Sequence, residues 1–448
     1  MKTRPLILLA ILNLIFFVIS PTIFAQTCIQ NFAPQPPLGF NSFDSYRSSL
    51  TEDKAFALID VMAEKYLPYG YEYFVMDAGW YTSMKPEKHS ELDLDSFGLY
   101  VVNPEYFPNG IKELADYAHK KGLKFGVWLM RGIPRLAVKQ NLPIPGTPYF
   151  AQDIADTNSI CVWSKSNYGV DMTKPGAQDY YNSIINTLAR WGIDFIKVDD
   201  VVPNPQEIVA IAKAIEDGGH TMIFSLSPGD VHYPTHLPYY KRANMLRITR
   251  DIWDNPLSIE KGFFAWDKFQ GISGPGFWPD LDMIPFGRLD VVNKHARQSK
   301  FSKDQMKTFI TQRALSASPL IIGGDLLTMD DFSYSLLTNQ EMLTCNQNGV
   351  MGVNVYRAGN IDVWLTPHKE DPRKGWIGIF NRSISDRNIT LTKRDLGFIA
   401  FEKSYNLTVT RQSFRLKDVW SDESITIKDK HTFTLQAEGV RFFKFQIQ

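Results

Sequence analysis

The segment WGIDFIKVDD, residues 191–200, decides the predicted fold because its apolar run ends in a lysine and two acids. Apolar residues on both faces are typical of a strand in a parallel sheet that helices cover. The segment before it, GAQDYYNSIINTLARWG, predicts an amphipathic helix that stops at Gly192, and PQEIVAIAKAIEDGG predicts a second helix after it. A strand between two helices is the repeating unit of an α/β fold.

This alternation of strands and helices extends from about residue 36 to residue 345. YEYFVMDAGW and LKFGVWLM predict strands on either side of the helix NGIKELADYAHKKG, which stops at Gly122. TMIFSLS, NMLRIT and SPLIIGG predict further strands. About eight strands in roughly 310 residues predict a (β/α)₈ TIM barrel. A doubly wound open sheet is the alternative, but no Gly-x-Gly-x-x-Gly motif follows the first strand.

The pattern changes after about residue 350. GNIDVWLTPH, KGWIGIFNRS and HTFTLQAEGVRFFKFQIQ are rich in β-formers and poor in helix signals, which predicts a small C-terminal antiparallel β-sandwich. We therefore expect three segments along the chain: a signal peptide over residues 1–25, the barrel over residues 26–345 and the sandwich over residues 346–448.

The first 25 residues carry the features of a secretory signal peptide. Lys2 and Arg4 form a basic start, PLILLAILNLIFFVIS supplies the apolar centre, and Ala25 precedes the expected cleavage site. A transmembrane anchor is the alternative, but the apolar run is short for a span and breaks at Pro21. We expect an exported protein, periplasmic or secreted, with no membrane association after cleavage. Cys28 follows no convincing lipobox, so a lipid anchor there is the less favoured alternative.

Charge and composition argue against some classes of partner and cofactor. The formal net charge is zero, so nothing points to nucleic acid or an anionic membrane. Aromatic residues make up 13% of the chain, which suits stacking on sugar rings and equally suits a large core. The three cysteines lack metal-ligand spacing, and the eight histidines form no His-Glu-x-x-His motif. We therefore expect no metal and no cofactor, while the oligomeric state stays open.

The end of the strand at residues 193–200 brings a charged pair to the barrel mouth, where the working residues of such barrels lie. Strand alternation puts Lys197 and Asp199 on one face and Asp200 on the other. Lys197 should lower the pKa of Asp199 and keep it ionised, as a nucleophile requires. A structural ion pair at a strand end is the alternative. Asp200 is expected to point away, as a helix cap or a solvated neighbour.

Three other strand ends also carry an inward acid, namely Asp77, Asp251 and Asp282, and the same parity places Arg247 beside Asp251. A helix cap or a structural ion pair accounts for each acid alone. Together with Asp199, however, four strands deliver an aspartate to one rim, and caps need no such convergence. Two carboxylates across a concave, aromatic-lined site are the equipment of a glycosidase.

Six motifs, in order, resemble those of glycoside hydrolase family 27, the family of α-galactosidases and α-N-acetylgalactosaminidases. PPLGFNSFDSY resembles its PPMGWNSW, YEYFVMDAGW its Y-x-Y-hydrophobic-x-D-D-G-W, and GIDFIKVDD its G-V-D-x-L-K-x-D. LRITRDIWD, GPGFWPDLDM and SPLIIGGDL match later segments of the family pattern. The resemblance covers most of the chain from about residue 36 onward and implies a glycosidase on a (β/α)₈ barrel.

The resemblance implies a role for each candidate. Asp199 falls at the family's nucleophile and Asp251 at its general acid/base. The positions that match sugar contacts are Phe43, Asp77, Trp128, Lys197, Arg247 and Asp282. Hydrolysis would then proceed with retention through a covalent glycosyl–enzyme intermediate, with the two carboxyl groups about 5–5.5 Å apart. The acid/base should have the higher pKa of the two, by burial and by the neighbouring negative charge.

Three positions depart from the family pattern. Ala78 replaces an acid that, in the family, holds galactose around O4 and O6. The replacement removes a charge-assisted hydrogen bond, which contributes about 1.5–3 kcal/mol to binding. Ser227 stands where α-galactosidases have a glutamate for the sugar 2-hydroxyl and α-N-acetylgalactosaminidases have a serine. Asp200 and Val201 stand where the family often has a cysteine.

The first expectation is therefore an exported α-D-galactosidase whose partner is a carbohydrate with terminal α-galactosyl residues. Four alternatives remain. Three are enzymes of the same fold: an α-N-acetylgalactosaminidase, suggested by Ser227; a β-L-arabinopyranosidase, whose pentose lacks C6 and needs no acid at Ala78; and an α-glucan-releasing relative. The fourth is a non-catalytic carbohydrate-binding protein, against which the paired Asp199 and Asp251 argue.

Overall fold

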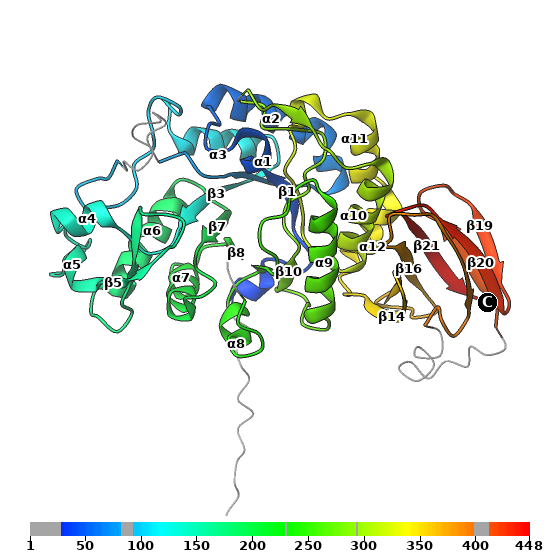
Figure 1. The fold of residues 1–448 in the computed structure, drawn as a ribbon. Coiled ribbons are helices and arrows are strands. Elements are labelled where there is room, and N and C mark those ends of the chain that lie inside the picture. The colour runs from blue at the N-terminus through cyan, green and yellow to red at the C-terminus, as the bar shows by residue number, and fades with distance from the viewer. Residues whose placement is uncertain (1–27, 82–92, 229–230, 293, 398–411) are drawn as a thin grey trace, which may run out of the picture.

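The structure, a computed structural model, describes residues 28–81, 93–228, 231–292, 294–397 and 412–448. Figure 1 shows a barrel of strands ringed by helices, and beside it antiparallel sheets at the C-terminal end, drawn in orange and red. The expected signal peptide, residues 1–25, lies outside the described residues.

Eight parallel strands form the barrel, in the order β10-β9-β8-β7-β3-β2-β1-β13. Their bounds are β1 (Leu38–Asn41), β2 (Tyr73–Met76), β3 (Lys124–Met130), β7 (Phe195–Asp199), β8 (Ile223–Leu226), β9 (Met245–Arg247), β10 (Trp278–Asp280) and β13 (Leu320–Ile322). A parallel bridge between Ile284, just after β10, and Ile322 of β13 joins the two edges of the sheet. The (β/α)₈ barrel is therefore confirmed, and the open sheet is not what forms.

Helices cover the outside of the barrel because each buries one apolar stripe. In α3, Ile111, Leu114, Ala115 and Ala118 are all buried, and Gly122 just beyond it has a left-handed φ of 86°. The helices are α1 (Phe43–Tyr46), α2 (Glu52–Lys65), α3 (Ile111–Lys120), α6 (Ala177–Arg190), α7 (Pro205–Asp217), α8 (Leu237–Tyr240), α9 (Pro256–Lys268), α10 (Lys303–Leu315), α11 (Asp331–Leu337) and α12 (Gln340–Gln347). None of the helices in the described segments has the length and apolar character needed to cross a membrane.

A long excursion between β3 and α6 adds a small sheet that sequence reasoning did not predict. It contains β4 (Ile133–Pro134), α4 (Arg135–Gln140), α5 (Ala151–Ile154), β5 (Ala155–Ile160) and β6 (Asn167–Val170), with the strands paired in the antiparallel order β4-β6-β5. The β5 sequence ADTNSI is polar, so it gives no strand signal by apolar alternation. Because the excursion follows the carboxyl end of β3, it rises beside the barrel mouth.

Short elements complete the barrel part of the chain. They are the 3₁₀ turns η1 (Cys28–Asn31), η2 (Leu67–Tyr69) and η4 (Leu326–Thr328), and the two-stranded ribbon of β11 (Arg288–Leu289) and β12 (Arg297–Gln298).

The C-terminal part is built from antiparallel strands, as its content of β-forming residues and lack of helix signals predicted. Six strands follow the order β14-β15-β16-β21-β18-β19, and β17 pairs with β20. Their bounds are β14 (Val353–Ala358), β15 (Ile361–Pro367), β16 (Lys374–Asn381), β17 (Arg387–Thr392), β18 (Phe414–Asp418), β19 (Ser424–Ile427), β20 (Lys430–Leu435) and β21 (Val440–Ile447). Val363, Ile377 and Phe443 of the larger sheet share one buried core with Phe433 of β20.

The other face of the larger sheet packs on the barrel. Trp364 of β15 stacks on Trp266 of α9 with 3.7 Å between the ring centroids, and Phe263 of α9 meets Phe380 of β16 edge to face. Trp266 Nε1 also donates a hydrogen bond to the backbone oxygen of Gly352 at 2.9 Å. The C-terminal sheet is thus fixed to the helix that follows β9.

Candidate active site

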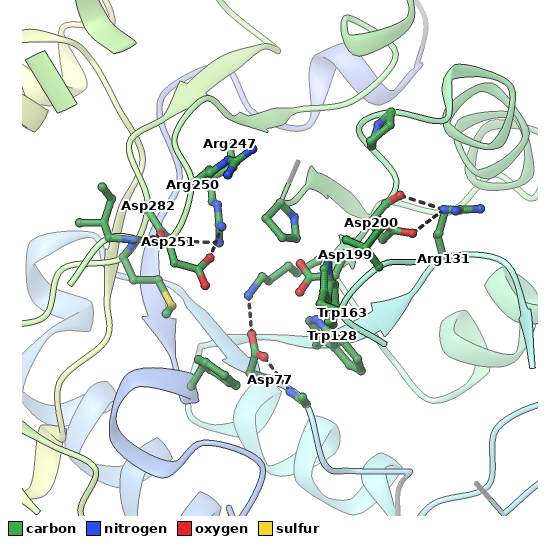
Figure 2. Close-up of a pocket in the computed structure, with 18 of the residues that line it drawn as sticks. Asp77, Trp128, Arg131, Trp163, Asp199, Asp200, Arg247, Arg250, Asp251 and Asp282 are labelled. Carbon is green, nitrogen blue, oxygen red and sulfur yellow. Dashed lines mark hydrogen bonds and ion pairs between the residues drawn. The ribbon is translucent and has the colours of Figure 1, made fainter. Parts of the chain in front are cut away.

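A cavity of about 990 Å³ opens at the carboxyl ends of the barrel strands; we call it the barrel cavity. Of the nine predicted site residues, all but Ser227 line it: Phe43, Asp77, Trp128, Lys197, Asp199, Arg247, Asp251 and Asp282. The four acids predicted to converge on one rim therefore do so. Figure 2 shows Asp199 and Asp251 on opposite sides of the cavity.

An ion pair between two strand ends holds the floor of the barrel cavity. Lys197 Nζ lies 2.9 Å from Asp77 Oδ2, which also accepts a hydrogen bond from Asn41 Nδ2 at 2.8 Å. The other oxygen, Oδ1, accepts from the backbone N–H of Ala78 at 2.8 Å. Burial lowers the pKa of Lys197, but Asp77 and then Asp199 outweigh it, so the net shift is upward and the ammonium stays charged.

Asp199 ends β7 with its carboxyl group directed into the barrel cavity. Burial and then the charge of Asp77 raise the pKa of Asp199, and together they exceed the lowering by Lys197 and by Arg247. Lys197 therefore acts in the predicted direction, but the expectation of a low net pKa is wrong because desolvation is larger. Oδ1 of Asp199 and Nε1 of Trp128 are both buried, and neither has a hydrogen-bond partner among the described residues.

Asp251 lies past the end of β9 and is much more open to water than predicted. Its side chain is 65% exposed and is held by an ion pair with Arg247 Nη2. We expected the acid/base to be the more buried of the two carboxyl groups, and the structure has the reverse order. The reason is position: β9 ends at Arg247, so Asp251 sits on the following loop and outside the packed strand.

Asp282 fixes the loop that carries Asp251. Its Oδ2 accepts a hydrogen bond from the backbone N–H of Ile252 at 2.9 Å, and its Oδ1 accepts from that of Met283 at 2.9 Å. Arg247 Nη1 approaches Oδ1 to 3.4 Å, so the same guanidinium binds both Asp251 and Asp282. Asp282 therefore positions the residue next to Asp251 as well as lining the cavity.

Asp200 does not point away as parity predicted. Its left-handed φ of 62° ends the strand alternation, and its side chain lines the barrel cavity. Arg131 Nε donates to Asp200 Oδ2 at 3.0 Å, and Arg131 Nη1 donates to Glu207 Oε1 at 2.7 Å. Asp200 is not the cap of α7, whose N-cap residue is Asn204. It is one end of a buried ion-pair network.

Ala78 and Ser227, the two positions on which the identity of the bound sugar depends, differ in whether they line the barrel cavity. Ala78 lines the cavity at the position of the second acid in the motif Y-x-Y-hydrophobic-x-D-D-G-W that this segment resembles. Ser227 is buried and is not among the lining residues, although the next residue, Pro228, is. The Ser227 hydroxyl has no hydrogen-bond partner in the part of the chain that the structure describes.

Among the residues of the barrel cavity that sequence reasoning missed are Asp44 and Trp163. Asp44 lies next to Phe43, is buried, and has a pKa raised well above its usual range, mainly by burial and then by Asp282. Trp163 lines the cavity from the excursion after β3. The available signals were an acid inside the FNSFDSY motif and a tryptophan in the stretch SICVWSKSN. Over the described segments, no three His, Cys, Asp or Glu side chains are grouped to hold a metal ion.

Comparisons with known proteins agree with this geometry. A family model described as melibiase matches residues 29–222, and one described as Alpha galactosidase A matches residues 159–348. The crystal structure of a family 27 β-L-arabinopyranosidase from Geobacillus stearothermophilus is 36% identical, with a TM-score of 0.87, over 94% of this chain and 98% of that one.

Two curated enzymes are more distant in sequence. An α-galactosidase from Cyamopsis tetragonoloba is 28% identical over 81% of this chain and 76% of its own length. An α-N-acetylgalactosaminidase from Gallus gallus is 27% identical over 75% of this chain and 76% of its own length. The family models match the barrel part, and the 36% identical structure covers 94% of this chain, so that it includes the C-terminal sheets. The chain therefore belongs to glycoside hydrolase family 27 and is a glycoside hydrolase.

Proposed function

We propose that the enzyme releases a terminal sugar with retention of configuration, through Asp199 and Asp251. In the first step the Asp199 carboxylate bonds to the anomeric carbon, the glycosidic bond breaks, and Asp251 gives its proton to the leaving oxygen. In the second step Asp251 takes a proton from water, the water oxygen bonds to the anomeric carbon, and the bond to Asp199 breaks. The location of the two acids on opposite sides of one cavity supports these roles.

The surroundings of the two acids suit these tasks. Asp199 is largely removed from water, which leaves its carboxylate poorly solvated, while Lys197 and Arg247 favour its ionised form. Asp251 is exposed, so it can exchange a proton with solvent between the two steps. A sugar hydroxyl that accepts a hydrogen bond from Arg247 competes with Asp251 for the guanidinium and releases Asp251 toward the glycosidic oxygen.

The glycone that this site fits best is β-L-arabinopyranose. A β-L-arabinopyranoside and an α-D-galactopyranoside share their ring configuration and differ by the hydroxymethyl group on C5. The observation that carries the choice is Ala78, which lines the barrel cavity with a methyl group and offers no acceptor for a 6-hydroxyl. The 36% identical relative named as a β-L-arabinopyranosidase supports the same choice.

α-D-Galactosidase activity is the second candidate, and the curated α-galactosidases support it. Galactose would fit the same ring contacts, and the small Ala78 side chain leaves space for C6 without a charge-assisted hydrogen bond to it. α-N-Acetylgalactosaminidase activity rests on Ser227, whose buried hydroxyl is not among the residues that line the cavity.

A panel of nitrophenyl glycosides tests these assignments: β-L-arabinopyranoside, α-D-galactoside, α-N-acetylgalactosaminide and α-glucoside. We expect the highest kcat/KM with the arabinopyranoside and a lower but measurable value with the galactoside. Proton NMR of the first-formed sugar should show the starting anomer, and an inverted anomer would rule out the proposed mechanism. The Asp199→Asn variant, assayed in parallel, gives the background rate. If the wild type hydrolyses none of the four glycosides, a carbohydrate-binding role is favoured instead.

We also propose that the enzyme is exported, on the evidence of the basic start and apolar centre of residues 1–25. Cell fractionation should recover the activity from the periplasm or medium, and mass spectrometry of the product should find an N-terminus near Gln26. Full-length protein in the cytoplasm would contradict this, and a lipid mass on Cys28 would indicate the anchored form.

A further inference from the structure

We propose that residues 158–163, which we call the rim segment, form a binding site for the sugar residue on the leaving-group side of the scissile bond, with Trp163 as its stacking platform. This inference rests on the proposed function, because it names the binding site for the leaving-group part of the glycoside, which the catalytic floor does not hold. The proposed occupant is a neutral sugar residue of an oligosaccharide.

The barrel cavity is larger than its catalytic floor. Its volume of about 990 Å³ is at the upper end of small-molecule sites, which hold about 300–1,000 Å³. The strand ends and the residues that follow them directly supply the charged floor, which includes Asp77, Lys197, Asp199 and Arg247 and has room for the one pyranose ring of the proposed reaction. The rim segment supplies Asn158, Ser159, Ile160, Val162 and Trp163 to a separate stretch of the wall. The cavity thus continues outward from the floor past this segment.

The chemistry of the rim segment matches the surface of a sugar. Trp163 is 53% exposed, Val162 95% and Ile160 53%, so three large apolar side chains stand in water at the edge of a catalytic cavity. Exposed apolar groups gathered in this way usually mark a binding surface. A tryptophan ring covers the C–H face of a pyranose, while the amide of Asn158 and the hydroxyl of Ser159 suit its hydroxyl groups.

The rim segment is fixed to the strand end that carries Asp199. Cys161 is buried between the exposed Ile160 and Val162, and burial and then the charge of the nearby Asp200 carboxylate raise the pKa of its thiol. Asp200 in turn is paired with Arg131. Figure 2 shows Trp163 on the side of the cavity that carries Asp199, across from Asp251.

Two substrates that differ only in the leaving group test this assignment. β-L-Arabinopyranosyl fluoride has a one-atom leaving group, and a disaccharide of β-L-arabinopyranose linked to galactose has a sugar there. We expect Trp163→Ala to lower kcat/KM for the disaccharide about tenfold and to leave the fluoride within about twofold. Trp163→Phe should recover part of the loss. If galactose is the preferred glycone, α-galactosyl fluoride and melibiose replace the pair.

Phe264→Ala is the matched control, because Phe264 is an aromatic residue that is 73% exposed on α9 and does not line the cavity. It should change neither substrate. Equal losses for fluoride and disaccharide in Trp163→Ala, or no loss for either, would overturn the proposal. A lower oligomeric state of Trp163→Ala by light scattering would also overturn it, since the apolar rim would then be a contact between copies of this chain.

Failure of the proposed function is a distinct result. In that case the wild type hydrolyses neither the fluoride nor the disaccharide. Calorimetry can then compare the Kd of the disaccharide for Asp199→Asn with its Kd for the double variant that also carries Trp163→Ala. A tenfold weaker Kd without the indole supports the platform, and an unchanged Kd overturns it.

Discussion

Arg131 binds Asp200 twice: its Nε donates to the backbone oxygen at 2.8 Å and to the carboxylate at 3.0 Å. The backbone N–H of Arg131 also donates to the carbonyl of Asp199 at 3.1 Å. The residue after β3 thereby holds the main chain of β7 at the proposed nucleophile. In the family pattern a cysteine often follows the nucleophile, and here an arginine and an aspartate join the strand ends instead.

Replacing Arg131 should therefore misplace Asp199 as well as destabilise the fold. Arg131→Ala leaves the buried Glu207 without its cation, a loss of about 3–5 kcal/mol. Arg131→Lys keeps the charge but loses the two-point contact, so we expect kcat to fall about tenfold or more with KM nearly unchanged. Steady-state kinetics well below the melting temperature measure this, and a wild-type kcat in Arg131→Lys would show that the arginine is only structural.

Asp199→Asn should remove turnover and leave the fold intact. The variant cannot form the glycosyl–enzyme bond, so activity should drop by about 10⁴-fold or more. Because burial raises the pKa of Asp199, the neutral amide relieves a desolvated charge, and the melting temperature should be equal or higher. Circular dichroism melts beside the assay check both parts. Near wild-type activity would move the nucleophile elsewhere.

Asp251→Ala should affect substrates according to their leaving group. A sugar leaving group needs the proton that Asp251 donates, so the rate of hydrolysis of glycosides with such a leaving group should fall by about 10²–10⁴-fold. The glycosyl fluoride needs little protonation, and its bond cleavage should survive as a burst of fluoride release before slow deglycosylation. A uniform loss across leaving groups, with no burst, would exclude the acid role of Asp251.

Asp44→Asn should stabilise the enzyme increasingly as pH rises. The native pKa of Asp44 is raised above about 3.8, so the folded chain holds a proton that the unfolded chain releases, and stability falls as pH rises between the two pKa values. The variant avoids this loss of about 1.4 kcal/mol per pH unit. Thermal melts from pH 4 to pH 7 should show a growing difference between variant and wild type. Asp429→Asn, an exposed aspartate between β19 and β20, is the control, and a pH-independent difference for Asp44→Asn would refute the argument.

Ala78→Asp should shift preference from pentose to hexose. The new carboxylate can accept from a 6-hydroxyl, so the ratio of kcat/KM for α-D-galactoside over β-L-arabinopyranoside should rise about tenfold or more. Ala78→Asn has the same size without the charge next to Asp77, so it separates hydrogen bonding from repulsion. A ratio that stays constant in both variants would show that C6 does not meet position 78.

The sequence predicted the convergence of acids because strand alternation is reliable inside regular parallel strands. It located Lys197 and Asp199, which lie within β7, on the correct face. It misplaced Asp200 because the sequence does not reveal that this aspartate has a left-handed φ of 62°. That conformation ends the alternation of side chains between the two faces of the strand. It also misjudged the burial of Asp251, which lies four residues beyond the last residue of β9.

The rim segment escaped prediction for a different reason. Its first three residues belong to β5, which is polar and pairs only within the small sheet β4-β6-β5, so apolar periodicity does not reveal it. The barrel and the C-terminal sheets were predictable because their strands bury large apolar side chains. Residues that bind a leaving group face water by necessity, and hydrophobic patterning carries little information about them.

The stack of Trp266 on Trp364 makes the C-terminal sheet part of the enzyme's working core. Trp266 belongs to α9, the helix that begins five residues after Asp251, and both indoles are fully buried between the two halves. The barrel is consequently not an interchangeable module. If recombination replaced this sheet by an unrelated one, the loss of Trp364 would leave a cavity the size of an indole behind α9. Because α9 follows the loop that carries Asp251, we expect catalytic activity to fall although no residue of the barrel cavity has changed.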